Sequence, residues 1–347
     1  MNIDFEKYTG IAVLVRLGAV FFIFALFLGG TTMGMQWFSH SLGKFFLSQV
    51  SNNETVFAGN LEVSASNIPA QNQEDLKMTE NALPLRNWQI EDLIIGAESA
   101  ISAEVSRNPE IETAKFLFKK NEEKKLPIAS LSKLMTALVV LEKYPLDQKV
   151  TISQEDMVQL GEQGSLKAGQ VLSVKNLLYI TLIESSNRAA YALSEIMGTQ
   201  NFVSLMNANA KALDLANTHF EDTTGLDSKS YSTAEDLIVL SAHLFEKYPL
   251  FKEIISFKEF NVYSEDGTFH HTLINTNKFL GEVPGVIGGK TGWTDEARGC
   301  FLVIQHLPNQ TGNLAEKNYL IHIILGTDKR FEEMKKMIDW VHTAYNW

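Results

Sequence analysis

Two long stretches of the chain are apolar on every side, and each predicts a different kind of helix. Residues 11–30 contain one charged residue, Arg16, and the run is about long enough to cross the roughly 30 Å hydrocarbon layer of a membrane. Residues 130–141 follow Pro127 and predict a helix buried in the centre of a domain, because a surface helix would carry a polar face. A polar residue on this second helix therefore needs a specific reason.

The N-terminal stretch predicts a membrane anchor. Lys7 and Arg16 favour an N-terminus that stays in the cytoplasm. A secretory signal peptide is the alternative, but no convincing small-x-small cleavage site follows Gly30 closely. We therefore predict a short cytoplasmic tail over residues 1–10, a single-pass transmembrane signal-anchor helix over 11–30, a flexible polar linker over 31–85 and one folded domain over 86–347. This domain would lie outside the cytoplasmic membrane, in a periplasm or in the extracellular space.

The remaining pattern predicts strands at both ends of this domain and helices between them. Short apolar runs predict strands over 99–105, 115–119, 286–292, 300–305 and 319–325, and helical spacing predicts helices over 130–141, 174–183, 188–197 and 330–345. This order favours an α+β (α/β) domain in which one antiparallel sheet holds both termini and a helical subdomain packs on it. In the last helix, apolar residues at helical spacing indicate core packing rather than a membrane anchor: Met334, Met337, Ile338, Val341 and Tyr345.

Composition removes several classes of function. The formal net charge is -11, which leaves no basic stripe to neutralise nucleic-acid phosphates, so we expect no DNA or RNA partner. Cys300 is the single cysteine, so an internal disulfide and a thiolate zinc site are both excluded. His270 and His271 fit no metal-ligand spacing and no His-Glu-x-x-His motif occurs. We therefore expect neither a metal nor another cofactor.

Ser130 and Lys133 are the polar pair on the predicted buried helix. At i and i+3 they share one face, and a hydroxyl at a helix N-terminus gains from amide dipoles that favour developing negative charge. Lysine among apolar neighbours loses solvation, which lowers its pKa toward a free amine. The pair therefore fits a serine nucleophile beside its own base, although the same spacing also fits a capping serine with an exposed lysine.

Two further polar motifs lie later in the chain. Ser185 and Asn187 fall between two predicted helices, where a hydroxyl can relay a proton and an amide can hold a carbonyl, although turn chemistry explains such a loop equally well. Lys290, Thr291 and Gly292 follow two glycines on a predicted strand, and the glycines would let another backbone come close. Lysine and threonine there could bind a carboxylate, and the alternative is an edge strand protected by a lysine.

In this order and with these gaps, the three motifs resemble those of the low-molecular-mass penicillin-binding proteins, the serine D-Ala-D-Ala carboxypeptidases. The segments that carry the resemblance are LPIASLSKLMTALVVLE, LSVKNLLYITLIESSNRAAYALSE, THFEDTTGLDSKSYSTAEDL, HTLINTNKFL and VIGGKTGWTDEARGCFLVI, and it extends over about residues 98–347. It implies a β-lactamase/transpeptidase-like fold for the domain. It also implies a substrate, a peptidoglycan stem peptide ending in D-Ala-D-Ala, and β-lactams as covalent inhibitors.

The resemblance assigns a role to each motif residue. Ser130 matches the nucleophile, Lys133 its general base, and Ser185 the hydroxyl thought to pass a proton toward the leaving amine. The positions that match substrate-binding residues are Asn187 for the substrate amide, Lys290 and Thr291 of the Lys-Thr-Gly motif with Gly292 for the terminal carboxylate, and Trp293, whose backbone N–H would form an oxyanion hole with that of Ser130. These assignments are what the resemblance implies.

Some features depart from the common family pattern, and some alternatives stay open. Ser186 stands where glycine is frequent, which could narrow the cleft, and Arg298 on a predicted turn is a further candidate for the carboxylate. The Glu-x-x-x-Asn pattern of class A β-lactamases is absent from the corresponding loop, so fast penicillin hydrolysis is not expected. A peptidoglycan endopeptidase would use the same residues. A non-catalytic wall-binding scaffold is a third alternative, disfavoured because every catalytic position is intact.

Overall fold

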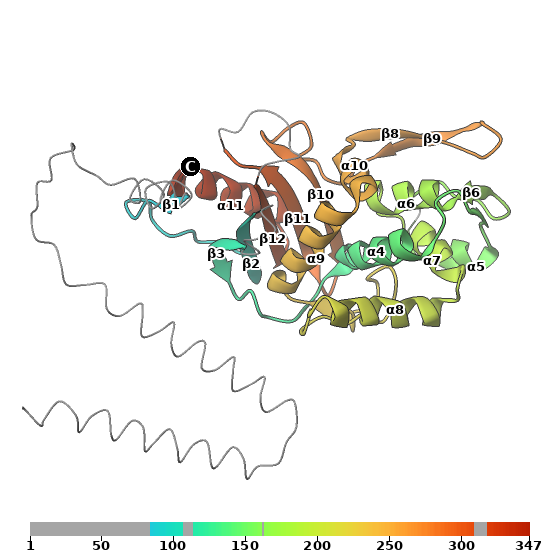
Figure 1. Cartoon of the computed structure of the whole chain (residues 1–347), viewed down its shortest axis with the longest axis horizontal. Helices are drawn as coiled ribbons and strands as arrows, with labels where there is room; N and C mark the ends of the chain where they lie inside the picture. The colour runs from blue at the N-terminus through green and yellow to red at the C-terminus, as the bar shows by residue number, and fades with distance from the viewer. Residues whose placement is uncertain (1–83, 107–113, 162, 309–317) are drawn as a thin grey trace, which may run out of the picture. The chain divides into compact units, whose positions relative to one another are not determined.

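The computed structural model describes residues 84–106, 114–161, 163–308 and 318–347 (Figure 1). The predicted anchor over 11–30, and the predicted linker except for its last two residues, lie outside the described residues. None of the helices within the described ranges combines the length and the apolar character needed to cross a bilayer. The following account concerns the domain alone.

A five-stranded antiparallel sheet forms the centre of the domain. Its strands lie in the order β10, β11, β12, β2, β3, with bounds β2 Ser99–Val105, β3 Lys115–Lys120, β10 Val286–Thr294, β11 Arg298–His306 and β12 Tyr319–Thr327. The pairing of β12 with β2, in which Ile321 lies opposite Ala103, joins the C-terminal strands to the N-terminal ones. The prediction of one antiparallel sheet that gathers both ends of the domain is therefore confirmed.

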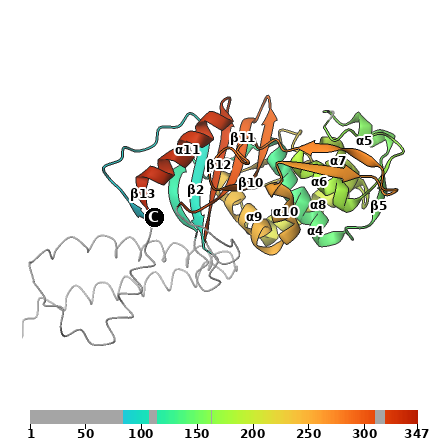
Figure 2. The same cartoon turned by 90° about the horizontal axis from the view of Figure 1, so that it is seen from above.

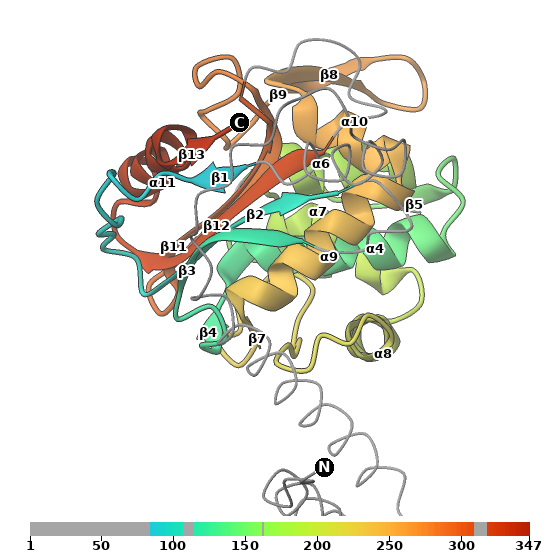
Figure 3. The ribbon, with the colours of Figure 1, turned by 60° about the vertical axis from the view of Figure 1, so that its left-hand side comes forward.

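Both faces of this sheet are covered by helices. Side chains alternate between two apolar clusters, so that Ile101 and Ile323 pack on one face while Ala100 and Ile324 pack on the other. Helix α9 (Ala234–Lys247) covers the first face and α11 (Arg330–Ala344) the second, as Figures 2 and 3 show. Because both faces are buried, the middle strand β12 is buried along its whole length and shows no polar alternation.

The helical subdomain lies beyond the β10 edge of the sheet (Figure 1). It comprises α4 Lys133–Lys143, α5 Gln154–Val158, α6 Val174–Ile183, α7 Asn187–Glu195, α8 Thr199–Ala212 and α10 Pro249–Ser256. Helix α4 is central, because its first eight residues are all buried. Four two-stranded pairs complete the described fold: β1 Leu85–Arg86 with β13 Tyr345–Asn346, β4 Leu126–Pro127 with β7 Tyr231–Ser232, β5 Lys149–Thr151 with β6 Val171–Ser173, and β8 Glu259–Tyr263 with β9 Phe269–Ile274.

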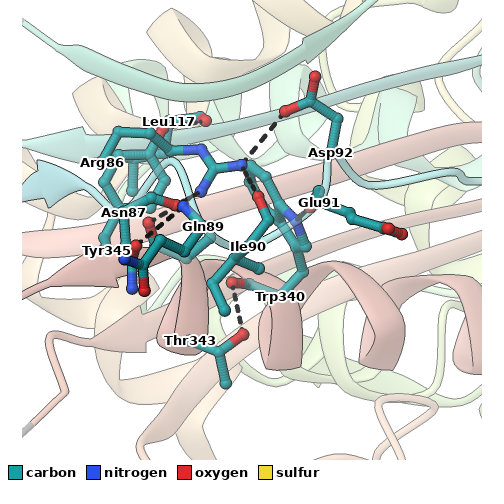
Figure 4. Close-up of polar contacts among 11 residues, drawn as sticks. Arg86, Asn87, Gln89, Ile90, Glu91, Asp92, Leu117, Trp340, Thr343 and Tyr345 are labelled. Atoms are coloured by element: carbon teal, nitrogen blue, oxygen red, sulfur yellow. Dashed lines mark hydrogen bonds and ion pairs between the residues drawn. The ribbon is translucent and has the colours of Figure 1, made fainter.

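The C-terminal helix is part of the core, as predicted. Met334, Met337, Ile338 and Val341 are buried on its sheet-facing side. Tyr345 lies beyond the helix in β13, where Figure 4 shows it beside Arg86 and Trp340. The Arg86 guanidinium carbon lies 4.8 Å from the Trp340 ring centroid, and its Nη2 donates to the carbonyl of Ile90 at 2.7 Å. The stacking of Arg86 on Trp340 links β1 to α11.

One predicted helix begins later than expected. The pattern places its start at residue 130, whereas α4 begins at Lys133 and Ala129–Ser132 form a 3-10 turn, η1. Ala129 has φ 47, a left-handed conformation, and the residues that follow it complete the 3-10 turn before the α-helix begins. The chain therefore turns sharply just before Ser130.

Candidate active site

Ser130 lies on the sharp turn between β4 and α4, and two glycines from distant segments pack against that turn. A Cβ atom on Gly225 would lie 1.8 Å from the Ala129 carbonyl oxygen, and one on Gly292 would lie 2.9 Å from the Ser130 amide nitrogen. Both approaches are possible only because glycine has no side chain. The turn, the 222–230 loop and β10 therefore meet at the serine.

Lys133 is fully buried one turn after Ser130. Its Nζ lies 2.9 Å from Ser130 Oγ, 2.6 Å from Asn187 Oδ1 and 2.8 Å from the Thr224 carbonyl oxygen. Burial removes water from the ammonium group and lowers the pKa of Lys133 to about 7, while the nearby Asp222 carboxylate acts in the opposite direction. The expected desolvation of this lysine is confirmed, and the capping serine with an exposed lysine is not what the fold contains.

The neighbours of Lys133 determine which way its lone pair points. A neutral amine has two N–H bonds and one lone pair. The Thr224 carbonyl oxygen and Asn187 Oδ1 can only accept hydrogen bonds. The orientation of the Asn187 amide is fixed because its Nδ2 donates to the Leu160 carbonyl at 2.7 Å. These two acceptors occupy both N–H bonds, so the lone pair is left for the hydroxyl of Ser130. The arrangement suits removal of a proton from Ser130.

The Ser185 loop lies between α6 and α7 and differs in detail from the predicted break. Ser185 has φ 65, and Ser186 is the N-cap of α7, so Asn187 is the first residue of the helix. The Ser186 hydroxyl accepts from the Ala189 amide at 3.2 Å and donates to the Gln163 carbonyl at 2.6 Å. Ser186 is fully buried, and both hydrogen bonds of its hydroxyl go to backbone groups of the protein.

Lys290 joins the strand motif to the Ser185 loop. Its Nζ donates to Ser185 Oγ at 2.6 Å and to the Thr291 carbonyl at 2.9 Å. Burial and the neighbouring cations Lys133 and Arg330 hold the pKa of Lys290 well below its usual range. Although β10 is an edge strand, Lys290 is 1% exposed, so the alternative of a solvent-exposed protective lysine is wrong.

The other β10 residues complete the wall of the site. Thr291 Oγ1 donates to Thr276 Oγ1 at 2.7 Å, and Trp293 keeps 47% of its surface exposed. The predicted close approach at the glycines is confirmed, since a Cβ on Gly289 would lie 2.2 Å from the Leu302 carbonyl oxygen of β11. Gly292 likewise lets the backbone of β10 approach the backbone of Ser130 closely.

Besides the two lysines, a further cation lies beside the site and could not be found from the sequence. Arg330 Nη1 donates to the Gly292 carbonyl at 3.4 Å, and its guanidinium carbon lies 5.8 Å from the Trp293 ring centroid. The candidate named from sequence, Arg298, instead forms an ion pair with Glu98 at 2.6 Å. Arg330 stands alone at the start of α11 with no motif around it, so only the packing of α11 on the sheet reveals its place.

Among the described residues, neither Cys300 nor a cluster of metal-ligand side chains adds a further candidate to the site. Cys300 is fully buried in β11, as expected, and burial raises the pKa of its thiol to about 12. Within the described ranges, no three His, Cys, Asp or Glu side chains converge as metal ligands. The groups that the described part of the chain does bring together at Ser130 are hydroxyl, amine and amide groups.

The fold and the site together define a class of protein. A buried amine directed at a serine hydroxyl, with a second lysine bonded to a second serine, is the arrangement of a serine acyl-transfer enzyme that uses lysine as its base. The profile of the D-alanyl-D-alanine carboxypeptidase family, peptidase S11, matches residues 93–311. The chain belongs to this family.

Individual relatives support the same family. A D-alanyl-D-alanine carboxypeptidase of Bacillus subtilis is 31% identical over 247 residues, a match that covers 68% of this chain and 61% of that protein. A D-alanyl-D-alanine endopeptidase of Pseudomonas aeruginosa is 32% identical over 237 residues, covering 67% of this chain and 74% of that protein. The chain thus spans less than two thirds of the length of its Bacillus relative.

Solved structures show the same mixed α/β fold. A D-alanyl-D-alanine carboxypeptidase from Mycobacterium tuberculosis superposes with a TM-score of 0.64 at 25% identity, covering 74% of this chain and 94% of that chain. Penicillin-binding protein D2 from Listeria monocytogenes, in its ampicillin-bound form, gives 0.60 at 33% identity, covering 73% of this chain and all of that chain. The prediction of a transpeptidase-like domain is confirmed.

Proposed function

We propose that this protein is a serine-type D-Ala-D-Ala carboxypeptidase that removes the terminal D-alanine from peptidoglycan stem pentapeptides. The observation that carries the proposal is the geometry at Lys133: two fixed acceptors leave its lone pair directed at Ser130, within a domain of this peptidase family. A pKa of about 7 lets a useful fraction of this amine be neutral at neutral pH.

Acylation uses groups that are already in place. Lys133 takes the proton of Ser130 as Oγ attacks the carbonyl carbon of the penultimate D-alanine. The resulting oxyanion is bound by the backbone N–H groups of Ser130 and Trp293. The C–N bond then breaks, and Ser185, hydrogen-bonded to Lys290, passes a proton to the leaving amine. D-alanine departs and the rest of the peptide stays as an ester of Ser130.

Substrate binding follows from the charges and amides around the serine. Lys290 and Thr291 bind the terminal carboxylate, and Arg330 adds a second positive charge behind Gly292. The second N–H of the Asn187 amide is available to a substrate carbonyl, because the first is donated to Leu160. Water finally hydrolyses the ester and restores Ser130.

The same reasoning makes β-lactams covalent inhibitors. A β-lactam carbonyl would acylate Ser130 as the peptide does, and the Listeria relative with ampicillin bound supports this part of the proposal. The loop that follows residue 217 lacks the Glu-x-x-x-Asn pattern of class A β-lactamases. We therefore expect a long-lived penicilloyl ester rather than rapid hydrolysis.

The site of action is proposed from the sequence alone. The apolar residues 11–30 would anchor the chain in the cytoplasmic membrane with the domain on the outer side. Peptidoglycan lies on that side, so the anchor would keep the enzyme next to its substrate.

The proposal is tested by incubating the purified protein with a fluorescent penicillin and, separately, with a stem pentapeptide. Intact mass should show one penicilloyl group, peptide mapping should place it on Ser130, and D-alanine should be released from the pentapeptide. Ser130→Ala should abolish both reactions. Ser132→Ala is the matched control, because this neighbouring buried serine has no hydrogen-bond partner among the described residues. Unchanged D-alanine release by Ser130→Ala would refute the mechanism.

A peptidoglycan D,D-endopeptidase is the second candidate function, because curated relatives from Pseudomonas aeruginosa and Escherichia coli carry that activity in their names. It would use the same acylation step and differ only in the leaving group, which is a crosslinked side-chain amine instead of free D-alanine. A crosslinked muropeptide dimer offered beside the pentapeptide distinguishes the two: monomer release without D-alanine release indicates the endopeptidase.

A further inference from the structure

The carbonyl that orients Lys133 belongs to a loop organised by a single carboxylate. Asp222 Oδ2 accepts from the amides of Thr224, Gly225 and Leu226 at 3.2, 3.0 and 3.0 Å, and it also accepts from the Thr224 hydroxyl. Its Oδ1 accepts from the Ser230 hydroxyl at 3.0 Å. Three consecutive N–H groups thus converge on one side chain, which makes the carbonyls of this turn point away from it.

One of those carbonyls points at the base. The Thr224 carbonyl accepts from Lys133 Nζ at 2.8 Å, and the preceding carbonyl, that of Thr223, accepts from Thr136 Oγ1 of α4 at 2.7 Å. Thr223, Thr224 and Gly225 are all buried. Gly225 packs closely against the Ala129 carbonyl, so the loop also supports the turn that carries Ser130.

We propose that Asp222 is a positioning residue for the general base, whose carboxylate fixes the Thr224 carbonyl against Lys133 and thereby directs the lone pair of the amine at Ser130. This inference rests on the proposed function of Ser130 and Lys133. Asp222 itself contacts neither residue through a hydrogen bond within the described residues; it acts through the backbone of the loop.

The charge of Asp222 has a second, separable effect. Asp222 and Lys290 both interact electrostatically with Lys133, and their charges act in opposite directions. The carboxylate raises the pKa of Lys133 against the larger effect of burial, whereas the two lysines repel each other. Removing the negative charge therefore shifts the titration of Lys133 to lower pH, while loss of the loop geometry reduces the reaction of the neutral amine.

The test is the pH dependence of the second-order rate constant for acylation by a fluorescent penicillin, measured with Asp222→Asn in the full chain. We expect the rate at high pH to fall at least tenfold and the midpoint of the acid limb to move to lower pH. The matched control is Asp236→Asn. Asp236 lies on α9 and accepts from the Asn217 amide and the Thr218 hydroxyl, and no hydrogen bond joins it to Lys133 or Thr224 among the described residues. For Asp236→Asn, the midpoint of the acid limb should stay at the same pH as in the parent protein.

A second variant separates geometry from charge and remains informative if Asp222→Asn does not fold. Thr136→Val removes the hydroxyl that holds the Thr223 carbonyl without changing any charge. We expect a lower plateau with an unmoved midpoint. If the parent is labelled at Ser130 but neither Asp222→Asn nor Thr136→Val changes the plateau, the role of Asp222 is refuted. If the parent itself is not labelled, the proposed function fails first.

Discussion

The pH dependence of acylation gives the sharpest quantitative test of how this site works. Only the neutral form of Lys133 can accept the Ser130 proton, and burial brings the pKa of this lysine to about 7. With that value about one tenth of the amine is neutral at pH 6 and about nine tenths at pH 8. The rate constant for acylation should therefore rise about tenfold between these two pH values and then level off.

A lysine with an unshifted pKa would give a different dependence of the acylation rate on pH. With an ordinary pKa near 10.5, the neutral fraction would rise about 100-fold over the same interval, and no plateau would occur below about pH 10. Burial thus predicts both the smaller rise and the plateau. The absolute rate at neutral pH is also higher, because a far larger fraction of the amine is already neutral.

The assay is labelling by a fluorescent penicillin at several concentrations, quenched at short times, from pH 5.5 to pH 9. Lys133→Arg is the control, since a guanidinium keeps its proton over this range and should give almost no labelling. Lys290 also titrates below its usual range and repels Lys133, so the observed midpoint belongs to the pair of lysines. A 100-fold rise without a plateau would refute the lowered pKa of Lys133. A rate that falls from pH 6 to pH 8 would show that Lys133 is not the base.

Two further predictions concern stability. Gly225→Ala should lower the free energy of unfolding by at least about 3 kcal/mol and reduce acylation, because φ is +82 and the new Cβ would overlap the Ala129 carbonyl. Gly267→Ala is the control, because Gly267 has the same φ of +82 with open space around it, and it should lower the free energy of unfolding by only about 1 kcal/mol. Equal losses of the two variants in urea unfolding would refute the packing argument. His322 is fully buried with a pKa lowered to about 3 by burial, so only the unfolded state binds a proton between about pH 6.5 and pH 3 and stability is lost as the pH falls. Between pH 7.5 and pH 5 this residue should cost about 2 kcal/mol, and His322→Gln should remove that part of the pH dependence; an identical dependence in the variant would contradict the assignment.

Much of the secondary structure could be predicted because its signals are local. The strand over 99–105 and the helix over 174–183 occur with the predicted bounds, since each is a short apolar run that ends at polar or turn residues. The start of α4 was placed too early for the opposite reason. The left-handed Ala129 is held by Gly225, a residue nearly a hundred positions later, and no pattern around residue 129 reports that contact.

The groups of the candidate site also fall into those that could be predicted from the sequence and those that could not. Its serines and lysines could be named because reactive side chains recur at fixed spacing. The structure places them in two sets of hydrogen bonds, one that joins Lys133 to Ser130 and Asn187 and one that joins Lys290 to Ser185. The Thr224 carbonyl could not be named, since a backbone oxygen is present at every position and only the fold selects one. Arg330 was missed because its role depends on α11 lying across the sheet.

The way the site is assembled explains why both glycines and a loop carboxylate matter as much as the reactive groups. The direction of one lone pair depends on two acceptors, Asn187 Oδ1 and the Thr224 carbonyl, that come from different segments. Loss of either acceptor would leave an N–H of Lys133 free to point at Ser130 and would oppose proton removal. Gly225 and Gly292 reduce that freedom by bringing their backbones into direct contact with the turn that holds the serine. In the proposed mechanism, Lys133 is therefore directed by close packing of three backbone segments, which side-chain motifs alone do not encode.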